Sequence, residues 1–129
     1  MRRDPYAILA KLRRLDTRAA QGRLAEAQML LLAQRAAVEA VAAELRRERP
    51  EDAPGTYGAF LARMLAARQQ EAAALVRAGA ALDAERDALA AARTGEKVLA
   101  ELRERRAAAD RRRLLHREQA RLEDALPRG

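Results

Sequence analysis

Apolar residues recur every three or four positions in the first third of the chain. The repeat is carried by seven positions, one of them polar: Leu24, Ala27, Leu31, Gln34, Val38, Val41 and Leu45. This spacing predicts a helix that buries one stripe of side chains against a partner helix. Nearer the N-terminus the spacing reappears in a frame offset by one residue, which predicts a local change of supercoil, at Ile8, Leu12, Leu15 and Ala19.

A second apolar stripe follows, spaced mainly by sevens. It begins with Leu61, Met64 or Leu65, Leu75, Leu82 and Leu89. It continues through Val98, Leu99 and Leu102, and it closes the chain with Leu115, Gln119, Leu122 and Leu126. This stripe predicts one long helix in the second half of the chain.

Proline and glycine separate the two stretches. Pro50 disfavours helical geometry at the residue before it, and Pro54-Gly55 is a turn dipeptide. Asp4-Pro5 has the residue types of an N-cap and a first helical position, and Thr56 is placed to cap the second helix. We therefore expect a single coiled-coil domain over residues 1–129, with a helix over about 5–49, a turn over 50–55 and a helix over about 56–126.

The predicted fold class is all-α, a long antiparallel two-helix coiled-coil hairpin with an overhanging C-terminal helix. At about 1.5 Å per residue, the first helix spans roughly 65–70 Å and the second roughly 105 Å. Folded back from the turn, the first helix ends opposite about Leu102, and roughly 25 residues of the second extend beyond it. The overhang would carry arginines from Arg103 to Arg117 beside a leucine stripe at Leu114, Leu115, Leu122 and Leu126.

The composition favours helices and excludes several other classes of protein. Of 129 residues, 34 are alanine and 19 are leucine, whereas aromatic residues make up 2% of the chain. Alanine, leucine, arginine and glutamate lose the least free energy on becoming helical. A β-sandwich or an α/β enzyme needs more bulky β-branched and aromatic residues to fill its core. No apolar run approaches the ~20 residues of a membrane span, and the first residues do not resemble a signal peptide.

Net charge is the one feature of the composition that suggests a binding partner. The chain carries 26 basic and 19 acidic residues, a net charge of +7, and 24 of the bases are arginine. A basic coiled-coil scaffold that binds nucleic acid or a membrane surface is therefore one interpretation. Against nucleic acid, the densest cluster, Arg111-Arg112-Arg113, spreads around its helix, and no aromatic residues interleave with it to stack bases.

Residues that carry catalysis or bind metals are scarce in this sequence. The chain has no cysteine and no serine, and His116 is the single histidine. A lone histidine lacks the partner ligands of a zinc site, and without serine no Ser–His pair can form. Thr94-Gly95-Glu96-Lys97 lacks the upstream glycine, the strand and the residue order of a phosphate loop. We expect no enzyme activity, no catalytic residues, no cofactor, no metal and no small-molecule substrate.

Both ends of the chain carry motifs of one known protein family. The opening, Tyr6-Ala7-Ile8-Leu9-Ala10-Lys11-Leu12-Arg13-Arg14-Leu15-Asp16, is similar to that family's leucine-rich, basic start. Farther along, Glu96-Lys97-Val98-Leu99-Ala100-Glu101-Leu102-Arg103-Glu104-Arg105-Arg106 resembles its Lys-x-x-Glu-x-Leu stretch. Arg117-Glu118-Gln119-Ala120-Arg121-Leu122-Glu123-Asp124 resembles its Glu-Gln-x-x-Leu-Asp-Glu terminus, with the last two acids in swapped order. Tyr57 and Phe60 stand where the family carries an aromatic residue just after the loop. With these segments the chain resembles the flagellar export protein FliJ family.

The resemblance implies a non-enzymatic, central-stalk-like antiparallel coiled coil of the flagellar type III protein export apparatus. It implies contacts with the hexameric export ATPase, the export gate protein FlhA and export chaperones, and a cytoplasmic location at the inner face of the cell membrane. The positions matching those that dock the gate are Phe60, Met64 and Ala67. The segment expected in the ATPase ring contains Leu102, Arg105, Arg106, Arg113, Arg117 and Gln119. The stalk protein of a virulence type III secretion system shares this fold and stays open as an alternative.

Overall fold

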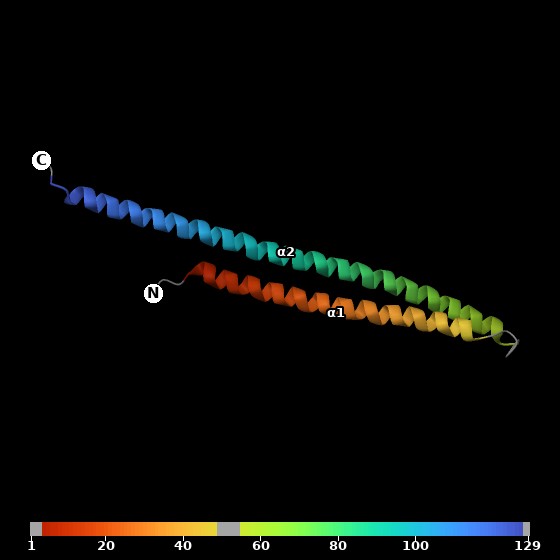
Figure 1. Ribbon diagram of the computed structural model, residues 1–129. Coiled ribbons are helices and arrows are strands. Elements are labelled where there is room, and N and C mark those ends of the chain that lie inside the picture. The colour runs from red at the N-terminus through yellow and green to blue at the C-terminus, as the bar shows by residue number, and fades with distance from the viewer. Residues whose placement is uncertain (1–3, 49–54, 128–129) are drawn as a thin grey trace. The chain divides into compact units, whose positions relative to one another are not determined.

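The computed structural model describes residues 4–48 and 55–127, and these residues form two helices (Figure 1). Helix α1 covers Pro5–Arg47, 43 residues, and helix α2 covers Tyr57–Ala125, 69 residues. No strand occurs in the described part of the chain. The expected all-α class is confirmed. Helix α1 starts at the predicted residue, and the other three helix ends differ from the predicted ones by one or two residues.

Helix α1 begins where its sequence predicts. The Asp4 carboxylate accepts a hydrogen bond from the backbone N–H of Tyr6 at 2.9 Å, and the Asp4 carbonyl accepts one from Ala7 at 3.2 Å. Asp4 is therefore the N-cap and Pro5 the first helical residue, which needs no donor at that position. The predicted break at Pro50 and Pro54 lies outside the described residues.

Helix α2 begins after a turn and ends before a proline. Gly55 and Thr56 form the described part of the turn, and the Thr56 carbonyl accepts a hydrogen bond from the N–H of Phe60 at 3.0 Å. That bond places Thr56 at the N-cap position, as expected. At the other end the N–H of Leu126 is shared between the carbonyls of Leu122 and Glu123, and Pro127 cannot continue the helix.

The chain divides into two compact units. The terminal unit consists of Met1–Thr17 and Ala91–Gly129, and the hairpin unit consists of Arg18–Ala90. In the hairpin unit, α1 and α2 lie side by side and antiparallel (Figure 1), because Arg23 pairs with Glu85 and Gln34 with Glu71. In the terminal unit, Asp4 pairs with Arg103 while Arg13 lies against Gly95, so this pair of segments is antiparallel as well.

The predicted apolar stripe of α1 is the face that packs in the hairpin unit. All seven of its members are buried or half-buried, with Ala27 the most enclosed. The polar member, Gln34, donates through Nε2 to the Glu71 carbonyl at 3.1 Å and also to the Glu71 carboxylate. A single paired polar group within an apolar stripe favours one register of the two helices over its neighbours.

Helix α2 supplies the opposing stripe, and its burial settles an alternative that the sequence left open. Leu82 and Leu89 are buried in the hairpin unit, and Leu99 is buried in the terminal unit. Met64 is half-buried whereas Leu65 is exposed, so Met64 belongs to the stripe. Farther along, every described residue from 110 to 127 is exposed, including Leu115, Gln119, Leu122 and Leu126.

The predicted change of frame near the N-terminus is wrong. Ile8, Leu12 and Leu15 are 54%, 52% and 53% exposed, and Ala19 is exposed too. The residues that pack instead are Tyr6, Ala10, Thr17 and Ala20. These positions continue the frame of Leu24 and Ala27, with exposed Arg13 at the one intervening position. The larger aliphatic side chains stay outside because small ones at the contact allow the two helical segments to pack closely.

No helix among the described residues has an 18-residue window apolar enough to cross a membrane. The longest bulky apolar run, Met29 to Leu32, has Met29, Leu30 and Leu32 exposed and Leu31 half-buried.

The buried leucines of α2 contribute most of the packing free energy per residue. Replacing Leu82 by alanine is expected to lower the free energy of unfolding by about 2–4 kcal/mol, because it removes buried apolar area and leaves a cavity. The matched change at exposed Leu122 is expected to cost less than about 0.5 kcal/mol. Urea unfolding followed by circular dichroism at 222 nm measures both, and equal costs would contradict this packing.

The Gln34–Glu71 pair gives a second stability prediction. Gln34→Leu leaves a half-buried carboxylate without its amide donor, so we expect a loss of about 1–3 kcal/mol despite the added apolar area. Adding Glu71→Leu to that variant removes the stranded charge and is expected to restore most of the loss. Urea unfolding of the two variants measures this recovery, and a double variant no more stable than the single one would refute the pairing.

Candidate functional site

The terminal unit holds all of the excess positive charge of the protein. Its residues include 16 bases and 9 acids, whereas the hairpin unit contains 10 of each. The composition alone does not reveal this separation, because acids and bases alternate throughout both helices. Electrostatic recognition of an anionic partner is therefore expected at the terminal unit.

Two contacts join the start of α1 to α2 within the terminal unit. Arg103 Nη2 lies 3.4 Å from a carboxylate oxygen of Asp4, and the Arg106 guanidinium lies 5.2 Å from the centre of the Tyr6 ring. Asp4 thus serves both as helix cap and as ion-pair partner. Around these contacts an open hollow of about 660 Å³ is lined also by Pro5, Ala100, Glu104, Ala107 and Asp110.

A smaller cleft lies alongside, also within the terminal unit. It has a volume of about 270 Å³ and is lined by Ala10, Arg13, Arg14, Glu96, Leu99, Ala100 and Arg103. Three arginines and one glutamate therefore line the same cleft. The alanines leave space between the helices, and the arginines contribute to the walls around it. Such an arrangement can bind carboxylates beside an apolar side chain.

Gly95 makes room for one of these arginines. A Cβ on Gly95 would lie 3.3 Å from Nη1 and 3.6 Å from Cδ of Arg13. The Arg13 side chain therefore lies across α2 at the position where any other residue would place its side chain. Of the five glycines that the structure describes, this is the one whose missing side chain accommodates a neighbour.

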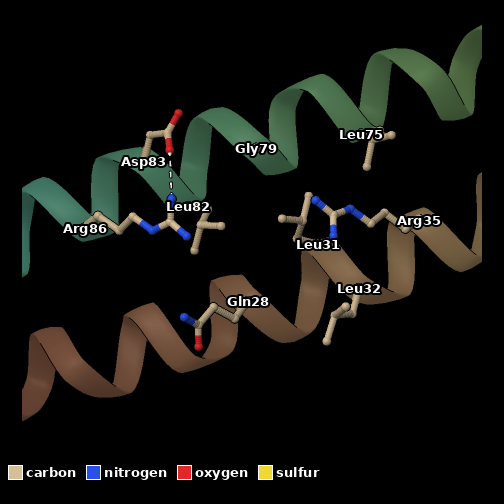
Figure 2. Close-up of a pocket in the computed structure, with 9 residues that line it drawn as sticks. All are labelled: Gln28, Leu31, Leu32, Arg35, Leu75, Gly79, Leu82, Asp83 and Arg86. Carbon is tan, nitrogen blue, oxygen red and sulfur yellow. Dashed lines mark ion pairs between the residues drawn. The ribbon is translucent and has the colours of Figure 1, made fainter.

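The hairpin unit contains an open groove of about 640 Å³ (Figure 2). Leu31 of α1 and Leu75 and Leu82 of α2 project into the space between the helices, and Gly79 leaves one side of the groove open (Figure 2). Arg86 is held by Asp83 of its own helix at 3.7 Å, which balances part of the charge at the rim. This groove is apolar at its base and belongs to the electrically neutral unit.

The residues that the resemblance assigns to gate docking lie on one face of α2. Phe60, Met64 and Ala67 are all half-buried, and the Phe60 ring stacks at 6.3 Å from that of Tyr57 with a tilt of 36°. They share the face that carries Leu61 and Leu82, so part of each side chain already packs within the hairpin unit. Their role as a docking patch stays a prediction.

The residues assigned to the ATPase ring are all exposed and do not form one cluster. Leu102 and Arg105 are three positions apart and share one side of α2. Arg106 contacts Tyr6, and Arg113 lies 3.8 Å from Asp110. Arg117 lies farther along the exposed segment. Arg111 lies 3.2 Å from Glu104, two turns earlier in the same helix.

Sequence reasoning did not predict the cleft: it passed over Arg13 and Arg14 as site residues and assigned Arg103 to the overhang. The signal that finds Arg13 is the three–four spacing of packed positions back from Leu24 to Tyr6, because exposed Arg13 stands between Ala10 and Thr17 in that spacing and lies against Gly95 of α2. That spacing is hidden in the sequence since its positions hold alanine, arginine and threonine instead of bulky aliphatic residues. Among the described residues, no group of three or more potential ligands is placed to hold a metal ion.

The two roles of Asp4 can be separated by mutation. Asp4→Ala removes both the cap and the ion pair, and we expect it to lower the free energy of unfolding by about 1 kcal/mol. Asp4→Asn keeps a side-chain oxygen that can accept the hydrogen bond from the Tyr6 N–H and loses only the exposed ion pair. We therefore expect it to lower the free energy of unfolding by about 0.3 kcal/mol. Thermal unfolding of the two variants tests this order, and equal losses would show that Arg103 matters more than the cap.

Compared with models of protein families, with curated proteins and with solved structures, the chain matches none.

Proposed function

We propose that this protein is a non-enzymatic coiled-coil component of the bacterial flagellar type III export apparatus, acting as a stalk that links the export ATPase ring with the export gate and export chaperones. The observation that carries the proposal is the terminal unit, where the excess charge coincides with a last segment of α2 that is exposed from residue 110 to residue 125. A helix inserted into a protein ring needs such a surface of uncommitted charged and apolar side chains.

The coiled coil and the overhang are part of this proposal. The three–four spacing of the buried positions of α1 supports a coiled-coil seam. The overhang is supported by the length of α2, which exceeds α1 by 26 residues, and by the exposure of its last turns. Leu115, Leu122 and Leu126 there have 65%, 69% and 66% of their surface exposed, which leaves an apolar stripe for a partner.

The proposed location follows from the proposed partners. A chain that contacts the export ATPase and the gate acts in the cytoplasm at the base of the flagellum, where the gate holds it at the membrane. The proposed gate contact uses Phe60, Met64 and Ala67, whose side chains are half-buried. The gate would therefore contact only the part of each side chain that the hairpin unit leaves exposed.

The experiment compares two charge-matched triple variants in the full-length chain. Arg105→Gln/Arg113→Gln/Arg117→Gln changes exposed residues of the terminal unit, and Arg35→Gln/Arg63→Gln/Arg77→Gln changes exposed residues of the hairpin unit. We expect the first to lower stimulation of a purified flagellar export ATPase about tenfold, by losing three charged contacts of about 0.5 kcal/mol each, and the second to leave it unchanged.

The outcomes decide between this proposal and a basic scaffold that binds nucleic acid. No stimulation by the unaltered chain, together with DNA binding that falls steeply with salt, would refute the export function and favour the scaffold. Equal loss in both triple variants would show that net charge matters and the terminal surface does not.

A further inference from the structure

We propose that the cleft between Arg13, Arg14 and Arg103 in the terminal unit binds an acidic amphipathic helix of a partner protein. This inference goes beyond the export function, since none of the three arginines belongs to the surface assigned to the ATPase ring. It also does not depend on that function, because it follows from the shape and charge of the cleft.

The shape of the cleft suits a side chain presented by a helix. Its volume of about 270 Å³ is below the ~300–1,000 Å³ of pockets that hold small ligands. Its apolar surface comes from Ala10, Leu99 and Ala100, which span less than one helical turn on each side. One bulky aliphatic side chain of a crossing helix fills such a space, with the rest of the partner lying over the rim.

The charge around the cleft requires an acidic partner. Glu96 is the one acidic residue that lines it, whereas three of the lining residues are arginines. Within the described part of the chain, neither Arg13 nor Arg14 forms an ion pair, and Arg103 is held only by the exposed Asp4 at 3.4 Å. Guanidinium groups bind carboxylates through two parallel hydrogen bonds, so glutamates flanking the inserted side chain would complete the contact.

Gly95 indicates that the arginine on this rim is positioned by the fold. The Arg13 side chain crosses α2 over the glycine, with Nη1 3.3 Å from where a Cβ would be. An ordinary solvated arginine needs no such gap in the opposite helix. In a helix that otherwise favours alanine, a glycine costs up to ~1 kcal/mol, and here it gives Arg13 a fixed path to the cleft.

A protein helix fits better than a nucleic acid. The cleft is short and is lined in part by apolar side chains, whereas a phosphate backbone needs a basic surface that continues from one phosphate to the next. Glu96 in the cleft and Glu101 and Glu104 beyond it interrupt the arginines along α2 and would repel successive phosphates. Tyr6, the one Tyr, Phe or Trp of the terminal unit, already has Arg106 over one face of its ring, so that face is not free to stack on a base.

The test measures binding of a fluorescein-labelled helical peptide to the full-length protein by fluorescence anisotropy. The probe is an Ala/Leu/Glu peptide of about five turns, with one leucine stripe flanked by glutamates. Its control has the same leucines with glutamine in place of glutamate. We expect the acidic peptide to bind at least tenfold more tightly than the control peptide at low salt. The difference in affinity is expected to shrink at about 0.5 M NaCl, because the Debye length there is only roughly 4 Å and the charges are screened.

Two pairs of variants locate the site. Gly95→Ala displaces Arg13, and we expect it to weaken acidic-peptide binding about threefold while raising the melting temperature by about 3 °C through helix propensity. Gly22→Ala, where a Cβ meets nothing within 4 Å, is expected to raise the melting temperature by a similar amount and to leave peptide binding unchanged.

The second pair tests the space in the cleft. Ala100→Leu fills the cleft without changing its charge, and we expect it to weaken acidic-peptide binding about tenfold. Ala66→Leu, at an exposed position of the hairpin unit, is expected to leave binding unchanged.

Three results would overturn the proposal. Equal affinity for the two peptides would show that the arginines do not select carboxylates. Unchanged acidic-peptide binding by both Gly95→Ala and Ala100→Leu would place the peptide elsewhere on the terminal unit. Duplex DNA that competes with the peptide, and whose binding is lost in Arg13→Gln/Arg14→Gln/Arg103→Gln, would assign the cleft to nucleic acid.

Discussion

The structure depends on close packing of helices through small side chains. The most buried residues of α1 are Ala20, with 1% of its surface exposed, Ala27 and Thr17. Thr17 donates its hydroxyl to the Arg13 carbonyl one turn earlier, so it packs without leaving an unpaired polar group. Small residues at a contact bury little apolar area in each layer. Stability must therefore accumulate over many layers, which is why the two helices are so long and why each leucine in the contact matters.

The same constraint explains how much of the fold could be predicted. Where the contact of α1 holds leucine and valine, from Leu24 to Leu45, hydrophobicity identifies the packed face correctly. Nearer the N-terminus the packed positions hold alanine and threonine while leucine and isoleucine lie outside, so hydrophobicity selects the wrong face. Helix ends were predictable because Asp4, Thr56 and Pro127 act locally on the backbone. The cleft was not, since it needs the register of Arg13 against Gly95, which only the pairing of the two helices determines.

The charged residues are distributed differently in the two units of the protein. The hairpin unit balances its charges, and it forms cross-helix contacts such as Arg23–Glu85 at 3.0 Å that secure the pairing of its helices. In the terminal unit the arginines outnumber the acids, and pairs such as Arg113–Asp110 lie within one helix. Exposed pairs of that kind contribute about 0.5 kcal/mol or less to stability. The excess arginines are therefore poorly explained by folding and better explained by binding.

Helical geometry separates only part of the two surfaces proposed for the terminal unit. Successive residues of a helix point about 100° apart, so Arg103 of the cleft and Leu102, which precedes it, point in different directions. Leu102 and Arg105 are three residues apart and share a side of α2, while Ala100 and Arg103 share another. The proposed ring contact through Leu102 and Arg105 therefore leaves the cleft accessible, whereas Arg106 lies three residues from Arg103 and contacts Tyr6 on the side of α1. Under both proposals the two partners draw on the same pool of positive charge, so binding of an acidic helix at the cleft would weaken the attraction of a second anionic surface.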